Sequence, residues 1–328
     1  VESGALPALE APADVPVIEE PLPPELEAVV RSAPPTPAAP PVPPYAAFVA
    51  QMAAAGIKLP PEEPEPPAEE PAAAPAAELP GPTRGWCLDR VARGEGLANL
   101  DLSRVDLSGA DLSSVSFQAS VLTGANLSGA KLGGSDFSDA ILQGADLRKA
   151  DLRRAILMNA DLTGAKLQEA QLQEAVLEGA DLGKAQLQNA AMAKVSAKGA
   201  LFTQAALSGA DLQDADLSKA DLSRALLGKT NLKGAKLVEA SLQGAVGHKV
   251  MAEGADFTKA RVGGANFGES IFKNLKGPGS VWAQAQLFRA DFSGAALEEA
   301  IFSAAYLCQS RFAAADLRRA RMDEANLR

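Results

Sequence analysis

Aspartate recurs in this chain at a fixed spacing. It occupies fourteen positions between Asp101 and Asp316 that are separated by multiples of five residues. Carboxylates held close together can perform general acid–base work, as in glycoside hydrolysis. However, a residue that returns at the same place in every repeat would lie on the convex outer surface of a repeated structure, away from any cleft. We therefore assign these aspartates a structural role.

The chain has too few histidine and cysteine residues to predict a catalytic or metal site built on them. His248 is the only histidine, which argues against a Ser-His-Asp triad, a Cys-His dyad and a histidine-ligated metal site. Cys87 and Cys308 stand outside any close pairing motif, so neither a disulfide framework nor a zinc site is expected, and Cys308 reads as a surface or corner thiol. We predict no enzymatic activity, no cofactor and no metal, and we expect a reducing, cytoplasmic environment.

A basic group is the clearest candidate for binding an anion. Arg148, Lys149, Arg153 and Arg154 lie close together in sequence, where they would suit a phosphate or an acidic partner. Lys149 and Arg154 each have an acidic residue twenty positions later. Arg148 and Arg153 do not, so we take these two as candidate interaction residues. The alternative is a solvated surface.

The elements that position these residues divide near residue 83. Of the 23 prolines, 22 lie in the first 82 residues, and residues 1–96 have a net charge of −10 whereas residues 97–328 carry 26 acidic and 26 basic groups. Residues 1–83 are predicted to be a disordered Pro/Ala/Glu-rich linker. Within it, residues 45–59 predict a short amphipathic helix, which is either a docking peptide or a nascent helix that collapses on itself. Residues 84–96 are predicted to cap the repeats.

No part of the chain predicts a membrane span or an export signal. The sequence has no run of about 18 apolar residues, and its N-terminus lacks the basic and apolar regions of a signal peptide. We therefore expect no membrane span.

From Leu97 to Leu327 every fifth residue belongs to one apolar series. Of its 47 members, 30 are Leu and 9 are Phe, and Ala usually stands two residues before each of them. In an extended chain residues two apart point the same way, so Ala and Leu face inward, the residue between them faces outward, and the other two turn a corner. The pattern predicts a parallel β-solenoid.

Charge pairs give the number of residues in one coil. At a spacing of twenty, opposite-charge pairs outnumber like-charge pairs by 20 to 2, against 7 to 9 at ten and 9 to 3 at fifteen. Because stacked like charges repel, twenty residues make one coil of four sides. Residues 97–328 then form about 12 coils in a rod about 55 Å long. This register also crosses Gly277-Pro278-Gly279, which predicts a distorted corner there and excludes an inserted loop.

The repeat of Ala, Asp or Asn, Leu and two polar residues, as in Ala110-Asp111-Leu112, resembles the pentapeptide-repeat proteins over residues 97–328. The resemblance implies an all-β fold, a right-handed quadrilateral parallel β-helix. It also implies a non-enzymatic scaffold or protein-interaction module, in a bacterial cell, whose protein partner the sequence does not identify. Nothing in the sequence predicts a nucleic-acid partner.

Two narrower functions stay open. The rod resembles accessory C-terminal modules of type VI secretion adaptor-like proteins, a layout that fits the long linker and the start at Val1. Another branch of the family mimics DNA and binds type II topoisomerases. A DNA mimic needs a continuous negative field, whereas residues 97–328 are neutral overall.

Apolar residues at outward positions are the candidate contact sites, because exposed apolar patches often mark interfaces. The alternative is that such positions are partly buried in a wide coil. Four pairs are twenty residues apart and so lie on one face each: Val121 with Ile141, Ile156 with Val176, Leu226 with Val246, and Val281 with Ile301.

The last coil is a candidate dimer interface, because a solenoid end presents unpaired backbone edges and an apolar layer. We expect an end-to-end homodimer that buries five residues: Leu307, Phe312, Leu317, Met322 and Leu327.

Overall fold

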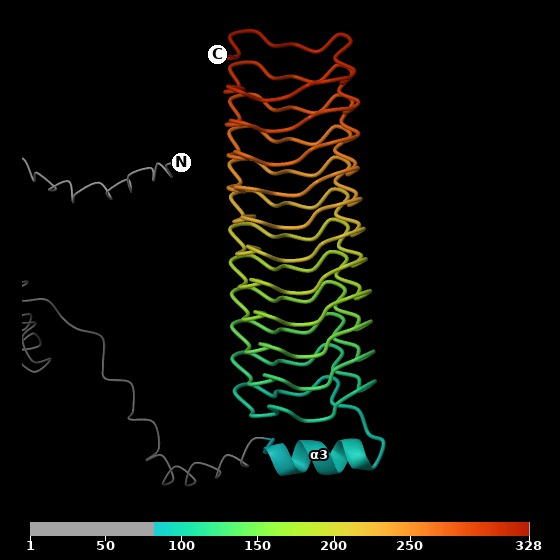
Figure 1. The fold of residues 1–328 in the computed structure, drawn as a ribbon. Helices are drawn as coiled ribbons and strands as arrows, with labels where there is room; N and C mark the ends of the chain where they lie inside the picture. The colour runs from blue at the N-terminus through green and yellow to red at the C-terminus, as the bar shows by residue number, and fades with distance from the viewer. Residues whose placement is uncertain (1–81, 328) are drawn as a thin grey trace, which may run out of the picture. The chain divides into compact units, whose positions relative to one another are not determined.

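The computed structural model describes residues 82–327. One helix, α3 (Arg84–Ala92), precedes a column of stacked coils that runs from residue 97 to the last described residue (Figure 1). The predicted helix over residues 45–59, and the predicted linker apart from residues 82–83, lie outside the described residues.

Each five-residue unit follows the same backbone path. In the unit that starts at Asp106, the aspartate faces outward, Leu107 points inward, Ser108 and Gly109 turn the corner, and Ala110 points inward again. The second corner residue always has a positive φ, whether it is glycine, as at Gly109 (63°), or not, as at Lys149 (58°). The predicted division into inward, outward and corner positions is confirmed.

Backbone hydrogen bonds join each coil to the next at a spacing set by twenty residues. The outward residues form parallel bridges at that spacing, as between Asp106 and Asn126. The amide of Leu107 donates to the carbonyl of Asn126 (2.7 Å), and the amide of Gly109 donates to that of Ser128 (2.9 Å). The coil of twenty residues predicted from charge pairs is therefore confirmed.

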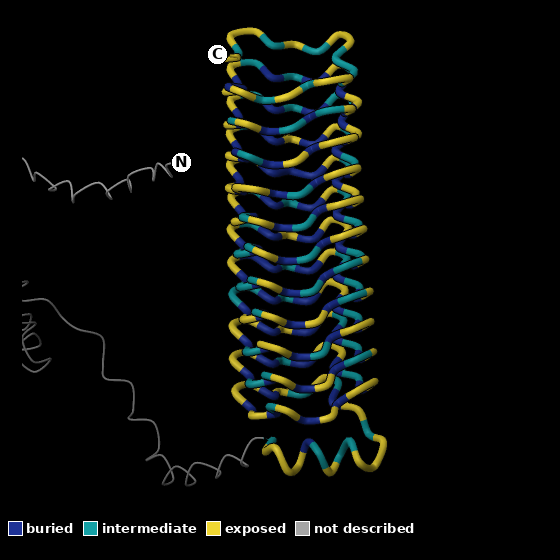
Figure 2. The backbone as a smooth tube through the Cα atoms, viewed as in Figure 1, coloured by how far each residue is buried: buried dark blue, intermediate teal, exposed yellow. Residues whose placement is uncertain are grey.

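The core is a continuous apolar column inside the coils. Buried residues recur along the coils from one end of the stack toward the other (Figure 2). The Leu and Phe residues of the apolar series, and the Ala residues that stand two positions before them, are almost all fully buried. Aromatic rings one coil apart stack on each other: Phe117 and Phe137 have centroids 4.6 Å apart, and Phe272 and Phe292 have centroids 4.8 Å apart. Burial of these side chains supplies most of the driving force for folding.

Two members of the apolar series are glycines, and each leaves space for the side chains of larger neighbours. A Cβ atom at Gly247 would lie 2.6 Å from the ring of Phe267, one coil later, and 2.7 Å from Val250. A Cβ atom at Gly277 would lie 2.8 Å from Leu275. These breaks in the Leu pattern thus preserve the total volume of the core.

The corner at Gly277-Pro278-Gly279 is regular, so the predicted distortion is wrong. The carbonyl of Pro278 accepts from Lys259 (3.0 Å), and the amide of Gly279 donates to Glu298 (2.8 Å), as at other corners. Proline is tolerated because the first corner residue donates no backbone hydrogen bond to a neighbouring coil.

Helix α3 lies across the first coil (Figure 1). The hydroxyl of Thr83 accepts a hydrogen bond from the amide of Trp86 (3.3 Å), which caps the N-terminus of the helix. Cys87 is fully buried in the core, and Leu88 and Val91 pack against it. The guanidinium of Arg84 donates to the carbonyl of Ser108 (2.9 Å). The helix therefore covers apolar surface that the first coil would otherwise expose.

We predict that restoring the repeat's usual leucine at Gly247 destabilises the protein. The Gly247→Leu side chain would overlap the ring of Phe267, and overpacking of this kind costs about 1–3 kcal/mol. Urea denaturation followed by circular dichroism would show a lower midpoint. The Phe267→Leu change, added to Gly247→Leu, should recover part of the loss. A Gly247→Leu single variant as stable as the parent would contradict this account of the core.

Candidate interaction surfaces

The outward aspartates complete the hydrogen bonding of the corner. The amide of the first corner residue has no partner in a neighbouring coil, and the aspartate two residues earlier accepts from it, as in Ser103 to Asp101 and Ser108 to Asp106 (both 2.9 Å). This bond from the backbone of Ser108 lowers the pKa of the Asp106 carboxyl. The predicted structural role of the aspartates thus has a physical basis: each carboxylate satisfies one backbone donor.

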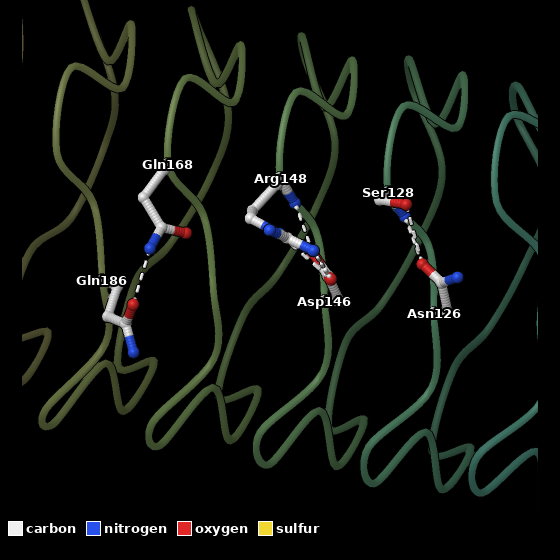
Figure 3. Close-up of polar contacts among 6 residues, drawn as sticks. All are labelled: Asn126, Ser128, Asp146, Arg148, Gln168 and Gln186. Carbon is white, nitrogen blue, oxygen red and sulfur yellow. Dashed lines mark hydrogen bonds and ion pairs between the residues drawn. The ribbon is translucent and has the colours of Figure 1, made fainter.

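Arg148 and Arg153 are not free, which corrects the sequence-based expectation. Arg148 Nη2 lies 2.5 Å from Asp146 Oδ2, and Arg153 Nη2 lies 2.6 Å from Asp151 Oδ2 (Figure 3 shows the first pair). Each arginine binds the aspartate of its own repeat, two residues earlier, because the corner folds the side chain back over the outward face. Counting partners at a spacing of twenty misses this contact.

Arg153, but not Arg148, borders an open hollow of about 540 Å³. Its lining also includes Arg154, which is paired with Glu174 (2.9 Å). Since both guanidiniums that line it already have carboxylate partners, this hollow offers no free cation for a phosphate.

The four predicted apolar pairs do stack, because each pair forms a parallel bridge between successive coils. Their exposure differs. Leu226 and Val246 are each 47% exposed, and Ile141 is 39% exposed. The remaining members are half-buried: Val121, Ile156, Val176, Val281 and Ile301.

Other exposed apolar residues were not predicted. Ile271 (39%) stacks on Met251 at the same spacing of twenty, so the criterion used for the four pairs also identifies this fifth pair. Leu201 (41%) and Tyr306 (45%) stand at outward positions without a large apolar neighbour one coil away. Pairing alone therefore underestimates the apolar outer surface.

In the last described coil, Phe312, Leu317 and Met322 are half-buried and Leu327 is 59% exposed. Phe312 stacks on Phe292 with centroids 5.0 Å apart. The fifth predicted interface residue, Leu307, is only 1% exposed, because the coil that ends at Leu327 covers it. Leu307 was thus wrongly included in the candidate end surface.

The thiols and the single histidine form no catalytic arrangement within residues 82–327. Both cysteines are free. Cys308 stands at a corner, which is one of the two places predicted for it, and it is buried there, so the other alternative, a surface thiol, is wrong. Burial raises the pKa of the Cys87 thiol. His248 is exposed and lies 3.5 Å from Glu269. Over the same residues, no three His, Cys, Asp or Glu side chains are grouped closely enough to hold a metal ion.

Helix α3 is too short to span a bilayer, and residues 82–327 contain no other helix.

A family model described as pentapeptide repeats matches the chain in eight copies, within residues 101–262 and 290–328. This match covers more than half of the sequence. A search of curated proteins found no match.

Solved structures of pentapeptide repeat proteins resemble the chain. HetL, involved in heterocyst differentiation regulation in the cyanobacterium Nostoc sp. strain PCC 7120, is 30% identical, with 74% of this chain and 95% of HetL covered and a TM-score of 0.37. QnrB1, a plasmid-mediated fluoroquinolone resistance protein, is 15% identical, with 57% and 89% covered and a TM-score of 0.36. A protein from the Arabidopsis thaliana thylakoid lumen is 28% identical, with 42% and 68% covered and a TM-score of 0.16.

We predict that Arg148 holds the pKa of Asp146 below its usual value, chiefly through its side-chain hydrogen bond. Because this pKa is lower in the folded than in the unfolded chain, the pair stabilises the fold at neutral pH, and the contribution is lost as pH falls through the folded pKa. Carboxyl NMR of the Arg148→Gln variant should show the Asp146 pKa rising toward its usual value. Arg153→Gln, the matched control, should leave it unchanged. An Asp146 pKa equal in the parent and in Arg148→Gln would contradict the assignment.

Proposed function

The chain belongs to the pentapeptide-repeat family, a family of protein-interaction scaffolds, and from this membership we propose that it is a non-enzymatic scaffold that binds partner proteins on its outer faces. The observation that carries this proposal is the set of apolar residues at outward positions, where the residue that the repeat uses most often is aspartate. Leu226 and Val246 are the most exposed of the predicted pairs. An exposed aliphatic pair contributes little to the fold and is typical of a contact surface.

We also propose that two segments of the chain have different structural roles. Residues 84–96 cap the β-helix, and residues 97–328 form it in about 12 coils of twenty residues. The burial of Cys87 and the contacts of Leu88 and Val91 with the core support the assignment of the cap. The free thiols Cys87 and Cys308 are consistent with a reducing compartment, so we propose a cytoplasmic location.

Of the narrower functions within the family, mimicry of DNA has the least support. Residues 97–328 carry equal numbers of acidic and basic groups, and arginines such as Arg148 and Arg153 neutralise the outward aspartates beside them. A surface of this kind lacks the continuous negative field of a phosphate backbone. No observation on residues 82–327 favours a secretion adaptor over a general scaffold.

Photo-crosslinking tests the scaffold proposal. A photoreactive amino acid at Leu226, in the full chain expressed in its native cell, should crosslink to a discrete protein, because apolar outward positions form the contact surface. Gln186 and Asn266, which are outward residues of the same face, are the matched controls and should give few crosslinks. The proposal fails if Leu226, Ile141 and Val176 give no more products than these controls.

We further propose that a second copy of the chain binds the end layer of the last described coil, here redefined as Phe312, Leu317, Met322 and Leu327. The apolar character of this layer, with one face of the Phe312 ring stacked on Phe292, supports the proposal. Burial of such a layer removes apolar area from water at about 25 cal/mol per Å².

Light scattering tests the dimer. The full chain should have twice the monomer mass at tens of micromolar, and Leu327→Asp should be monomeric, because a carboxylate in the interface would be buried without a partner. Leu226→Asp places the same charge on an outer face and should remain dimeric. A parent protein that is monomeric at this concentration would exclude the end-to-end dimer.

A further inference from the structure

One outer face carries an apolar strip that differs from the rest of the surface. Ala206, Leu226 and Val246 occupy the outward position of three successive coils and form parallel bridges with one another. Leu226 and Val246 are each 47% exposed, so this is the one predicted pair in which both members are exposed. We call these three residues the 206–246 strip.

Backbone donors beside the strip have no acceptor. In many other repeats an outward Asp or Asn accepts from the amide two residues later, as Asn266 accepts from Gly268 (3.3 Å) in the next coil. Ala206, Leu226 and Val246 have no side-chain oxygen. Accordingly the amides of three first corner residues have no hydrogen-bond acceptor within the described part of the chain: Ser208, Gly228 and His248. They form a column of donors one coil apart, about 4.8 Å.

The corners that flank the strip are basic. Three exposed cations stand on them, Arg224, Lys229 and Lys249, and a fourth, Lys184, stands on the same edge one coil before the strip. The corner positions on either side of the strip contain no Asp or Glu from residue 183 to residue 249. Lys249 forms an ion pair with Glu269 of the next coil (3.5 Å), whereas the other three have no ion-pair partner within residues 82–327. A rod without net charge thus has a locally positive face.

One contact on this face is repulsive. Lys229 and Lys249 are twenty residues apart and so lie on the same corner of successive coils. Of the charged pairs at this spacing in residues 97–328, only this one and Asp161 with Asp181 place like charges together. Everywhere else the register pairs opposite charges. An external carboxylate beside Lys229 would remove this repulsion.

Building on the proposed scaffold function, we propose that the strip binds an acidic amphipathic helix of a partner protein, aligned with the rod axis. Carboxylates of the helix accept hydrogen bonds from the amides of Ser208, Gly228 and His248, in the place that an aspartate of the repeat otherwise takes. Aliphatic side chains beside them pack on Leu226 and Val246. Residues i, i+3 and i+7 of a helix rise by about 0, 4.5 and 10.5 Å, which matches coil positions at about 0, 4.8 and 9.6 Å.

An acidic helix fits this face better than a nucleic acid does. The residues at the centre of the strip are aliphatic, whereas proteins that bind single-stranded nucleic acid place aromatic side chains where bases stack. In other repeats the corresponding amides donate to an aspartate carboxylate. The geometry of the amides beside the strip therefore suits a carboxylate. Aliphatic contacts and carboxylates together are found on one face of an amphipathic acidic helix.

The test measures binding of a synthetic helical peptide to the full chain by fluorescence anisotropy. In the peptide, Glu recurs at i, i+3 and i+7 beside a stripe of Leu. The Leu226→Asp variant restores the residue that the repeat most often uses, so it should fold with an unchanged or higher melting temperature. It should bind the peptide at least about 10-fold more weakly, because the new carboxylate occupies the amide of Gly228 and repels the peptide. Arg224→Gln should weaken binding less and reduce its salt dependence.

Matched controls distinguish binding at the 206–246 strip from nonspecific binding elsewhere on the rod. Ile141→Asp makes the same change at an exposed residue of another face and should leave binding unchanged. A peptide with Gln in place of Glu should bind weakly. Equal weakening by Ile141→Asp, equal binding of the Gln peptide, or equally effective competition by single-stranded DNA would each overturn the proposal. If the Glu peptide fails to bind while photo-crosslinks still form at Leu226, the acidic-helix inference is wrong and the scaffold function stands.

Discussion

The hydrogen bonds between coils are the constraint on which the rest of the structure depends. They require each residue to lie beside the residue twenty positions away, as Asp106 lies beside Asn126. Once this spacing is fixed, every side chain belongs to one of twenty columns, and each column is either inside, outside or at a corner. A sequence is compatible with this fold when each side chain can pack against the side chains twenty residues before and after it in the same column.

The same constraint explains the aspartates. A coil satisfies four of the five backbone amides of each unit through neighbouring coils or its own turn, and it leaves the first corner amide, such as that of Ser108, without a backbone partner. An outward Asp or Asn supplies the missing acceptor from two residues away. Where an apolar residue replaces it, the unit gives up this bond, and the core beneath is unchanged. Outward positions can thus vary with little effect on packing, which makes them available for binding.

Sequence alone identifies most of the fold because the periods are strict. The period of five gives the inward columns, and the charge pairs at twenty give the coil; the structure confirms both. The errors have different causes. Arg148 reaches Asp146 within its own repeat, and side-chain reach of this kind is not encoded in the pattern of residue types. Leu307 lies twenty residues before Leu327, so the register itself places a coil over it, and including it in the end surface overlooked this.

The overall charge of the rod conceals its surface chemistry for a related reason. Equal numbers of acidic and basic residues give a net charge of zero, but the coils distribute these residues among separate columns. Within one column, successive residues are about 4.8 Å apart along the rod axis. Within about one Debye length only the nearest columns contribute to the local field. Lys184, Arg224 and Lys229 therefore act together beside the 206–246 strip, although acidic residues elsewhere on the rod balance them. In a solenoid the meaningful quantity is the charge of a column and its neighbours, and a partner's chemistry is best inferred at that scale.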